Sequence, residues 1–161
     1  RDAQESRGLG DVYKRQVMMN LARETARDGE GATKLMECVV DHAPTEAVAK
    51  SVALSVINSS LLKAAIFAAD ANWGRILCAI GYAEGDFDIS KVEVVLSSSK
   101  GSVKVCENGT GVDFSEDEAF KILSEDEIVI RIDMHDGADK SVAWGCDLTY
   151  EYVKINAEYR S

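Results

Sequence analysis

The sequence predicts an α+β fold in which mixed sheets pack against helices. Residues 17–83 contain three helical patterns and two apolar segments of strand length. Residues 84–161 contain four segments in which apolar and polar residues alternate, as strands do when one face is buried. With 161 residues, 46% of them hydrophobic, the chain can fill a core. We therefore expect a helix and strand part over 17–83 and a strand-richer C-terminal subdomain over 84–161.

The N-terminal segment, residues 1–16, is polar and charged and shows no sustained helical or strand period. A helix is predicted from Val17, because Val17 and Leu21 fall on one apolar stripe. Gly29 follows in the position usual after a helix end. A strand is then expected over about 33–40.

A second helix should begin after Thr45, whose hydroxyl can accept a hydrogen bond from an early backbone amide. It would end near residues 58–60 and bury one apolar face. That face carries Val48, Val52, Ala53, Val56 and Ile57. The continuous apolar run Leu61–Ala69 is short for a helix and is typical of a fully buried strand.

Asp70 stands where the N-cap of a third helix belongs. That helix would place Trp73 on its apolar face and end at Gly81. The segment 84–88 is acidic and rich in turn residues, so we expect a connection there.

The alternating segments 91–97 and 102–108 predict a β-hairpin, because turn residues join them. Ser115 and Glu118 have the spacing of a capping box, which predicts a short helix.

Further strands are expected at 127–134 and 141–148, around a turn at 135–140. A final helix should run from about Asp147 to Ser161. Apolar residues continue almost to the end of the chain, which predicts that this helix docks against the protein. They are Tyr150, Tyr152, Val153 and Ile155.

The net charge of −10, with no cluster of Lys and Arg, argues against nucleic acids and acidic membranes as partners. The longest apolar stretch, within Leu61–Ala69, is too short to span a bilayer, so we expect a soluble, cytoplasmic protein. The cysteines stand singly and indicate reduced, mostly buried thiols rather than a metal or redox site. They are Cys38, Cys78, Cys106 and Cys146.

Glu30 lies between Gly29 and Gly31, at a predicted joint from helix to strand. Glycines suit positions that need a positive φ or a close approach to the backbone. The segment GEGATK, residues 29–34, is similar to a phosphate loop, but its spacing differs and an acidic side chain would repel phosphate. Two interpretations remain: a structural turn with a solvated glutamate, and a pocket carboxylate that binds an amino group or transfers a proton.

Three longer blocks are more specific than these motifs: RDGEGATK at 27–34, SSLLKAAIFAADANWGRILCAIGY at 59–82 and AWGCDLTYEYVKINAEYRS at 143–161. Together they resemble the ornithine acetyltransferase family of arginine biosynthesis, whose bifunctional members are also N-acetylglutamate synthases. The resemblance covers about residues 17–161 and corresponds to the C-terminal part of the family's β chain. Residues 1–16 fall outside it, and our hypothesis is a cloning, assembly or translation artefact. Finding these codons in frame at the native locus would contradict that hypothesis.

The resemblance implies an autoprocessing, N-terminal-nucleophile-type fold, in which a precursor cleaves itself into α and β chains that form a heterotetramer. A threonine freed at the start of the β chain would take acetyl from N-acetylornithine and pass it to glutamate. Bifunctional members also accept acetyl from acetyl-CoA, and no other cofactor and no metal is implied. Residue 1 is Arg1, so we expect this fragment to lack the nucleophile, the α chain and the second α/β pair, and to be inactive alone.

Residue by residue, the resemblance implies substrate binding by Glu30, Asn156 and Ser161, with an additional acid/base role for Glu30. Ser161 stands where many members end in threonine. A rival hypothesis makes the chain a non-catalytic module that binds amino acids or a partner chain on the same fold. An upstream reading frame that encodes the threonine would favour the enzyme, and a start codon near residue 1 would favour the module.

Overall fold

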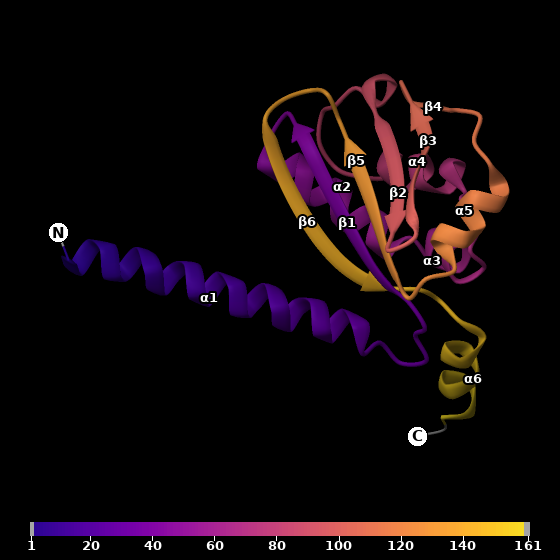
Figure 1. Ribbon diagram of the computed structural model, residues 1–161, viewed down its shortest axis with the longest axis horizontal. Helices are drawn as coiled ribbons and strands as arrows, with labels where there is room; N and C mark the ends of the chain where they lie inside the picture. The colour runs from indigo at the N-terminus through magenta and orange to yellow at the C-terminus, as the bar shows by residue number, and fades with distance from the viewer. Residues whose placement is uncertain (1, 160–161) are drawn as a thin grey trace.

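One mixed six-stranded sheet forms the centre of the protein (Figure 1). The computed structural model describes residues 2–159. The strands are β1 (Leu35–Ala43), β2 (Glu93–Ser98), β3 (Gly101–Glu107), β4 (Thr110–Gly111), β5 (Glu127–Asp133) and β6 (Asp139–Cys146). The helices are α1 (Asp2–Arg27), α2 (Glu46–Asn58), α3 (Ser60–Phe67), α4 (Trp73–Gly81), the 3₁₀ helix η1 (Ile89–Lys91), α5 (Glu116–Leu123) and α6 (Tyr150–Glu158). The predicted α+β class is confirmed.

The strand order is β4-β3-β2-β5-β1-β6. β2 and β3 form the antiparallel hairpin that the sequence predicts. β1 is parallel to β5 and antiparallel to β6, so it lies between these two strands. The strands on either side of the turn at 135–140 therefore do not pair with each other. Because β1 comes from residues 17–83 and its neighbours from 84–161, the two predicted parts share one sheet.

The core lies between this sheet and the helices α2 to α5. α2 packs against β1 and β6, whereas α5 packs against β2 and β3. Figure 1 shows α2, α3 and α4 behind the sheet. Alternate residues of the central strands, such as the register partners Met36 and Ile128, are buried. This alternation explains why the period of two predicts the strands correctly.

α2 has the predicted cap and the predicted apolar face. The Thr45 hydroxyl accepts a hydrogen bond from the Val48 amide at 3.2 Å. All five residues expected on the apolar face are buried: Val48, Val52, Ala53, Val56 and Ile57. Ser115 likewise caps α5 by accepting from the Glu118 amide at 3.3 Å, which confirms the capping prediction there.

The prediction of a buried strand over Leu61–Ala69 is wrong, because most of this run is helix α3. Ser59 caps the helix by accepting from the Leu62 amide at 3.4 Å. Leu62 and Ile66, four residues apart, are buried, whereas Leu61 is exposed. Four of the nine positions in the run are alanines, which add to its apolar character but favour a helix.

Asp70 is not the N-cap of α4, contrary to the prediction. Asn72 occupies that position, and its Oδ1 accepts a hydrogen bond from the Arg75 amide at 3.1 Å. Asp70 lies two residues earlier and accepts a hydrogen bond from the Asn72 side-chain amide at 3.0 Å. The aspartate therefore holds the capping side chain instead of capping the helix itself.

α1 begins at Asp2, well before the predicted start at Val17, and ends at Arg27 near the predicted end. Its apolar stripe does not enter the core: Val17, Met18 and Leu21 are 55–62% exposed. In Figure 1 the helix extends away from the sheet. Its C-terminal end is attached to β5 through Glu127, which accepts hydrogen bonds from Arg23 and Arg27.

α6 begins at Tyr150, capped by Thr149, and not at Asp147 as predicted. The predicted docking of its apolar residues is also wrong, because no residue from Tyr150 to Glu158 is buried. The four apolar positions at 150, 152, 153 and 155 point to different sides of a helix, so they form no single face to bury. At the start of α6, Phe67 and Tyr150 meet edge to face.

Within residues 2–159 no single helix is long and apolar enough to cross a bilayer. α2 and α3 pass that test only when taken together, and they are bent by 58° at their junction. Their apolar sides face the core of this fold.

The cap of α4 generates a stability prediction. Replacing Asn72 with alanine should lower the free energy of unfolding by about 1 kcal/mol, because the Arg75 amide loses its acceptor. Asp70→Ala should cost less, within about 0.5 kcal/mol, because Asp70 acts only through Asn72. Urea denaturation of the two variants measures both values. A larger loss for Asp70→Ala would restore Asp70 as the cap.

Candidate functional site

Two connecting segments run side by side at the end of the sheet. The first, residues 28–34, joins α1 to β1, and the second, residues 147–149, joins β6 to α6. The Asp147 amide donates to the Lys34 carbonyl at 3.2 Å, which aligns the two backbones. Each segment leads to one residue that the sequence singles out, Glu30 in the first and Asn156 beyond the second.

Asp147 is the main link between the two segments. Its Oδ1 accepts hydrogen bonds from the backbone amides of Thr33 at 2.8 Å and Lys34 at 3.0 Å. Its Oδ2 accepts from the Thr33 hydroxyl at 2.5 Å. The carboxylate is only 3% exposed, so all three bonds form away from bulk water, where they are strongest.

Thr149 makes a second link in the opposite direction. Its hydroxyl donates to the Gly31 carbonyl at 2.6 Å and accepts from the Tyr152 amide at 3.2 Å, so one side chain fastens the loop and caps α6. Gly31 has φ +68°, and a Cβ there would lie 2.7 Å from the Tyr152 nitrogen. Glycine is therefore required for both conformation and space.

Glu30 and Asn156 meet at this junction, although 126 positions separate them in sequence. The Asn156 side-chain amide donates to Glu30 Oε2 at 2.7 Å and to the Tyr152 carbonyl at 2.9 Å. Both residues are exposed, so a ligand can reach them from solvent. The pair offers a carboxylate for a positively charged group and an amide that can donate or accept. Ser161, the third predicted site residue, lies outside the described residues.

Lys34 connects this junction to the core. Its ammonium donates to the carbonyl oxygens of Ile66 at 2.7 Å and Leu123 at 2.6 Å, at the C-terminal ends of α3 and α5. A cation is favourable there, because the last carbonyls of a helix have no partner within the helix. Burial lowers the pKa of Lys34, and the nearby Asp147 carboxylate opposes that shift.

Sequence reasoning missed the roles of Thr33, Lys34, Asp147 and Thr149. Thr149 and Tyr152 have the spacing of a cap and its amide, a signal hidden by placing the helix start at Asp147. The partners of Asp147 lie more than 110 residues away, so no local pattern indicates them. Glu30 was found because its two flanking glycines are a local signal.

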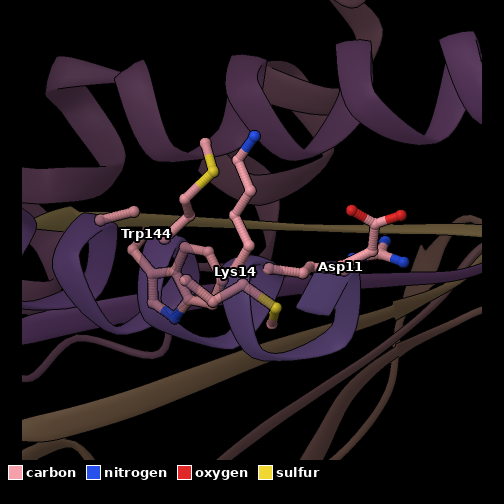
Figure 2. A pocket seen from close by; sticks show the side chains of 7 residues that line it. Asp11, Lys14 and Trp144 are labelled. Carbon is pink, nitrogen blue, oxygen red and sulfur yellow. The ribbon is translucent and has the colours of Figure 1, made fainter. Parts of the chain in front are cut away.

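A groove of about 310 Å³ lies between α1 and β6, and Asp11, Lys14 and Trp144 are among the residues that line it (Figure 2). Neither Glu30 nor Asn156 lines it. Three of its seven lining residues, Asp11 among them, belong to the segment 1–16 that the sequence hypothesis treats as non-native. The groove is therefore separate from the pair formed by Glu30 and Asn156.

Metal ligands are not gathered within the described part of the chain, where no group of three or more His, Cys, Asp or Glu is placed to hold an ion. Cys38 and Cys106 are buried, as expected of structural thiols, whereas Cys78 is exposed and Cys146 is half-buried. Burial raises the pKa of Cys38, which keeps that thiol protonated.

Comparison with known proteins identifies the family. A model of the ArgJ family matches residues 8–161. The chain belongs to the ArgJ family. The family match begins within the segment 1–16, and the origin of that segment stays a prediction.

Among curated relatives, the ArgJ arginine biosynthesis bifunctional protein of Caldanaerobacter subterraneus subsp. tengcongensis is 54% identical over 145 residues, 90% of this chain and 36% of the relative. The protein of the same name from Thermotoga neapolitana is 44% identical over 160 residues, 98% of this chain and 40% of the relative. The chain thus spans well under half the length of these ArgJ relatives.

A solved ArgJ structure has the same fold. The crystal structure of the arginine biosynthesis bifunctional protein ArgJ from Bacillus halodurans matches with a TM-score of 0.84 and 41% identity. The match covers 93% of this chain and 70% of that one. The resemblance derived from the three sequence blocks is thereby confirmed at the level of family and fold.

The contact of Gly31 with α6 generates a second prediction. Gly31→Ala should lower the free energy of unfolding by about 1–3 kcal/mol, because the new Cβ strains the backbone and collides with the start of α6. The matched control is Gly81→Ala, where no atom lies within 4 Å and the helical position favours alanine by up to about 1 kcal/mol. Chemical denaturation measures both. Equal effects of the two substitutions would contradict the assigned role of Gly31.

Proposed function

We propose that this chain is the C-terminal part of the β chain of a glutamate N-acetyltransferase, which moves acetyl from N-acetylornithine to glutamate in arginine biosynthesis. The observation that carries the proposal is the 2.7 Å hydrogen bond between Asn156 and Glu30. These are the two described residues to which the family resemblance assigns substrate binding. The names of the ArgJ relatives, which place them in arginine biosynthesis, support the same pathway.

In this proposal Glu30 binds the amino group of the substrate. A substrate ammonium is a stronger partner for a carboxylate than the neutral amide of Asn156, so it can replace Asn156 at Glu30 Oε2. The released amide then orients a second polar group of the substrate, and the Ser161 hydroxyl adds a third contact. Glu30 also serves as acid or base when the amine attacks or leaves.

The nucleophile of the reaction comes from outside residues 1–161. It is a threonine freed by self-cleavage, whose hydroxyl takes the acetyl group as an ester while ornithine leaves, and glutamate then attacks the ester. In a bifunctional enzyme acetyl-CoA supplies the same ester. Because that threonine is supplied from outside these residues, the fragment by itself is expected to be inactive.

The remaining segments of the enzyme are its proposed partners: the α chain and a second α/β pair. The exposed stripe of α1 supports this, since Val17, Met18 and Leu21 together present a contiguous apolar surface to solvent. A cytoplasmic location completes the proposal and agrees with four free cysteines.

An acetyl-transfer assay on the full-length product of the native gene tests the function. We expect Glu30→Ala to lower kcat/KM at least about 100-fold, the range of a lost acid/base group. Asn156→Ala should lower it about 10-fold or more, the loss typical of one hydrogen bond to a charged group. Glu93→Ala, which removes a carboxylate paired with Lys104, is the matched control and should leave activity unchanged.

The opposite outcome is equally informative. A folded, self-cleaved full-length protein without acetyl transfer would reject the enzyme and leave the amino-acid-binding module. Titration calorimetry with glutamate and ornithine would then decide whether a binding module is correct.

The partner proposal makes a separate prediction about the α1 stripe. When the preceding part of the protein is co-expressed, it should co-elute with this chain in size-exclusion chromatography. The double substitution Val17→Ser and Leu21→Ser should abolish this, because the stripe loses its apolar contacts. Phe120→Ser removes an equally exposed apolar residue, 59% against 62% for Leu21, and should change nothing. Co-elution that survives the double substitution would reject α1 as the contact.

A further inference from the structure

The position of α6 does not come from core packing. No residue from Tyr150 to Glu158 is buried, so the hydrophobic effect does little to hold Asn156 where it is. The start of the helix is held by polar links from Asp147 and Thr149 to the loop that carries Glu30, together with the edge-to-face contact of Phe67 and Tyr150. The distance between Glu30 and Asn156 therefore depends on a few hydrogen bonds.

Asp147 carries most of that dependence. Among the described residues the buried polar side chains are Asp147 and Thr149, and both belong to the same linker. Asp147 accepts three hydrogen bonds from two consecutive residues of the loop, which fixes the loop in orientation as well as in distance. A single contact would leave the loop free to rotate, whereas contacts to the amides of both Thr33 and Lys34 do not.

The C-terminal end of the loop, at Lys34, is also held in place. Lys34 follows Thr33 directly, and its ammonium is held by the carbonyls of Ile66 and Leu123 in the core. Asp147 thus ties α6 to a loop that is itself anchored to α3 and α5. Losing the Asp147 side-chain contacts would therefore loosen the start of α6 relative to an anchored loop, with the Thr149 bond to Gly31 and the Phe67–Tyr150 contact still in place.

We propose that Asp147 is the positioning residue of this site: it sets the separation of Glu30 and Asn156 by holding residues 33 and 34 against the start of α6. The inference rests on the proposed function, since it assigns Asp147 a role in acetyl transfer through Glu30. Asp147 itself touches neither substrate nor nucleophile in this assignment. Its effect on catalysis is geometric.

The geometric role predicts a specific pattern of substitutions. Asp147→Ala removes all three hydrogen bonds and should lower kcat/KM about 100-fold, the loss typical of misplacement by about 1 Å. Asp147→Asn keeps a carbonyl oxygen for the two backbone amides, and its side-chain amide can donate to the Thr33 hydroxyl. Asparagine should therefore restore activity to within about fivefold of the wild type, the value of about one neutral hydrogen bond.

The experiment measures kcat and KM for glutamate in the full-length enzyme. Asp41→Ala is the matched control, because Asp41 is a half-buried carboxylate bonded to Arg131 in the same sheet. We expect Asp41→Ala to lower the melting temperature without changing KM. A similar loss of activity in Asp41→Ala and Asp147→Ala would reduce Asp147 to a stability residue and overturn the proposal.

A double-mutant cycle with Glu30→Gln tests the positioning role of Asp147 separately from the proposed function. If Asp147 acts through Glu30, then adding Asp147→Ala to the Glu30→Gln variant should lower kcat/KM by less than about threefold. The reason is that the contribution of Glu30, through which Asp147 acts, has already been lost. Losses that multiply would overturn the positioning role. If Glu30→Gln alone leaves activity intact, the proposed function fails instead, so the two failures are distinguishable.

This experiment requires that the Asp147→Ala variant folds. If Asp147→Ala does not yield folded protein, Thr33→Val takes its place in the cycle, because it removes only the hydroxyl donor of the three contacts. We expect a loss of about fivefold in kcat/KM, the value of about one hydrogen bond, and the same absence of multiplication with Glu30→Gln. Full activity of Thr33→Val together with multiplied losses for Asp147→Asn would overturn the proposal.

Discussion

The buried carboxylate of Asp147 is the interaction on which the rest of this site depends. Taking a carboxylate out of water costs free energy unless each oxygen has hydrogen-bond donors, and here three donors supply them. That requirement forces the loop at 28–34 and the linker at 147–149 into one arrangement. The close turn at Gly31, the Thr149 hydroxyl and the contact between Glu30 and Asn156 all lie within this arrangement.

The site is polar at its surface and is secured to the core from beneath. Lys34 fills the carbonyl-lined space at the ends of α3 and α5, so two helices that pack in the hydrophobic layer also hold the loop. β1 begins directly after Lys34 and lies between β5 and the edge strand β6. A chain of contacts therefore runs from the sheet to the exposed pair. In this arrangement Glu30 and Asn156 are accessible to a ligand while their positions stay fixed.

Short sequence patterns predict an element correctly wherever the interaction that forms it lies within a few residues. Thr45 and Ser115 cap their helices because a hydroxyl three residues before an amide needs no distant partner. Local sequence signals fail where two residues could fill one role, as with Asp70 and Asn72. They also fail where burial alone distinguishes strand from helix, as in Leu61–Ala69. For α6 the apolar residues predict docking, although helical geometry spreads them around the axis.

Sequence patterns were enough to predict the α+β class, the hairpin of β2 and β3, the caps of α2 and α5, and Glu30 as a candidate, because each leaves a pattern of residues close together in the chain. The resemblance of three sequence blocks to the family added Asn156 as a second candidate site residue. Three features are visible only in the folded protein: β1 separates β5 from β6, the α1 stripe is exposed, and Asp147 joins the two halves of the site. These features depend on which distant segments satisfy one another's hydrogen bonds and bury one another's surface, and such pairings leave no periodic trace in the chain.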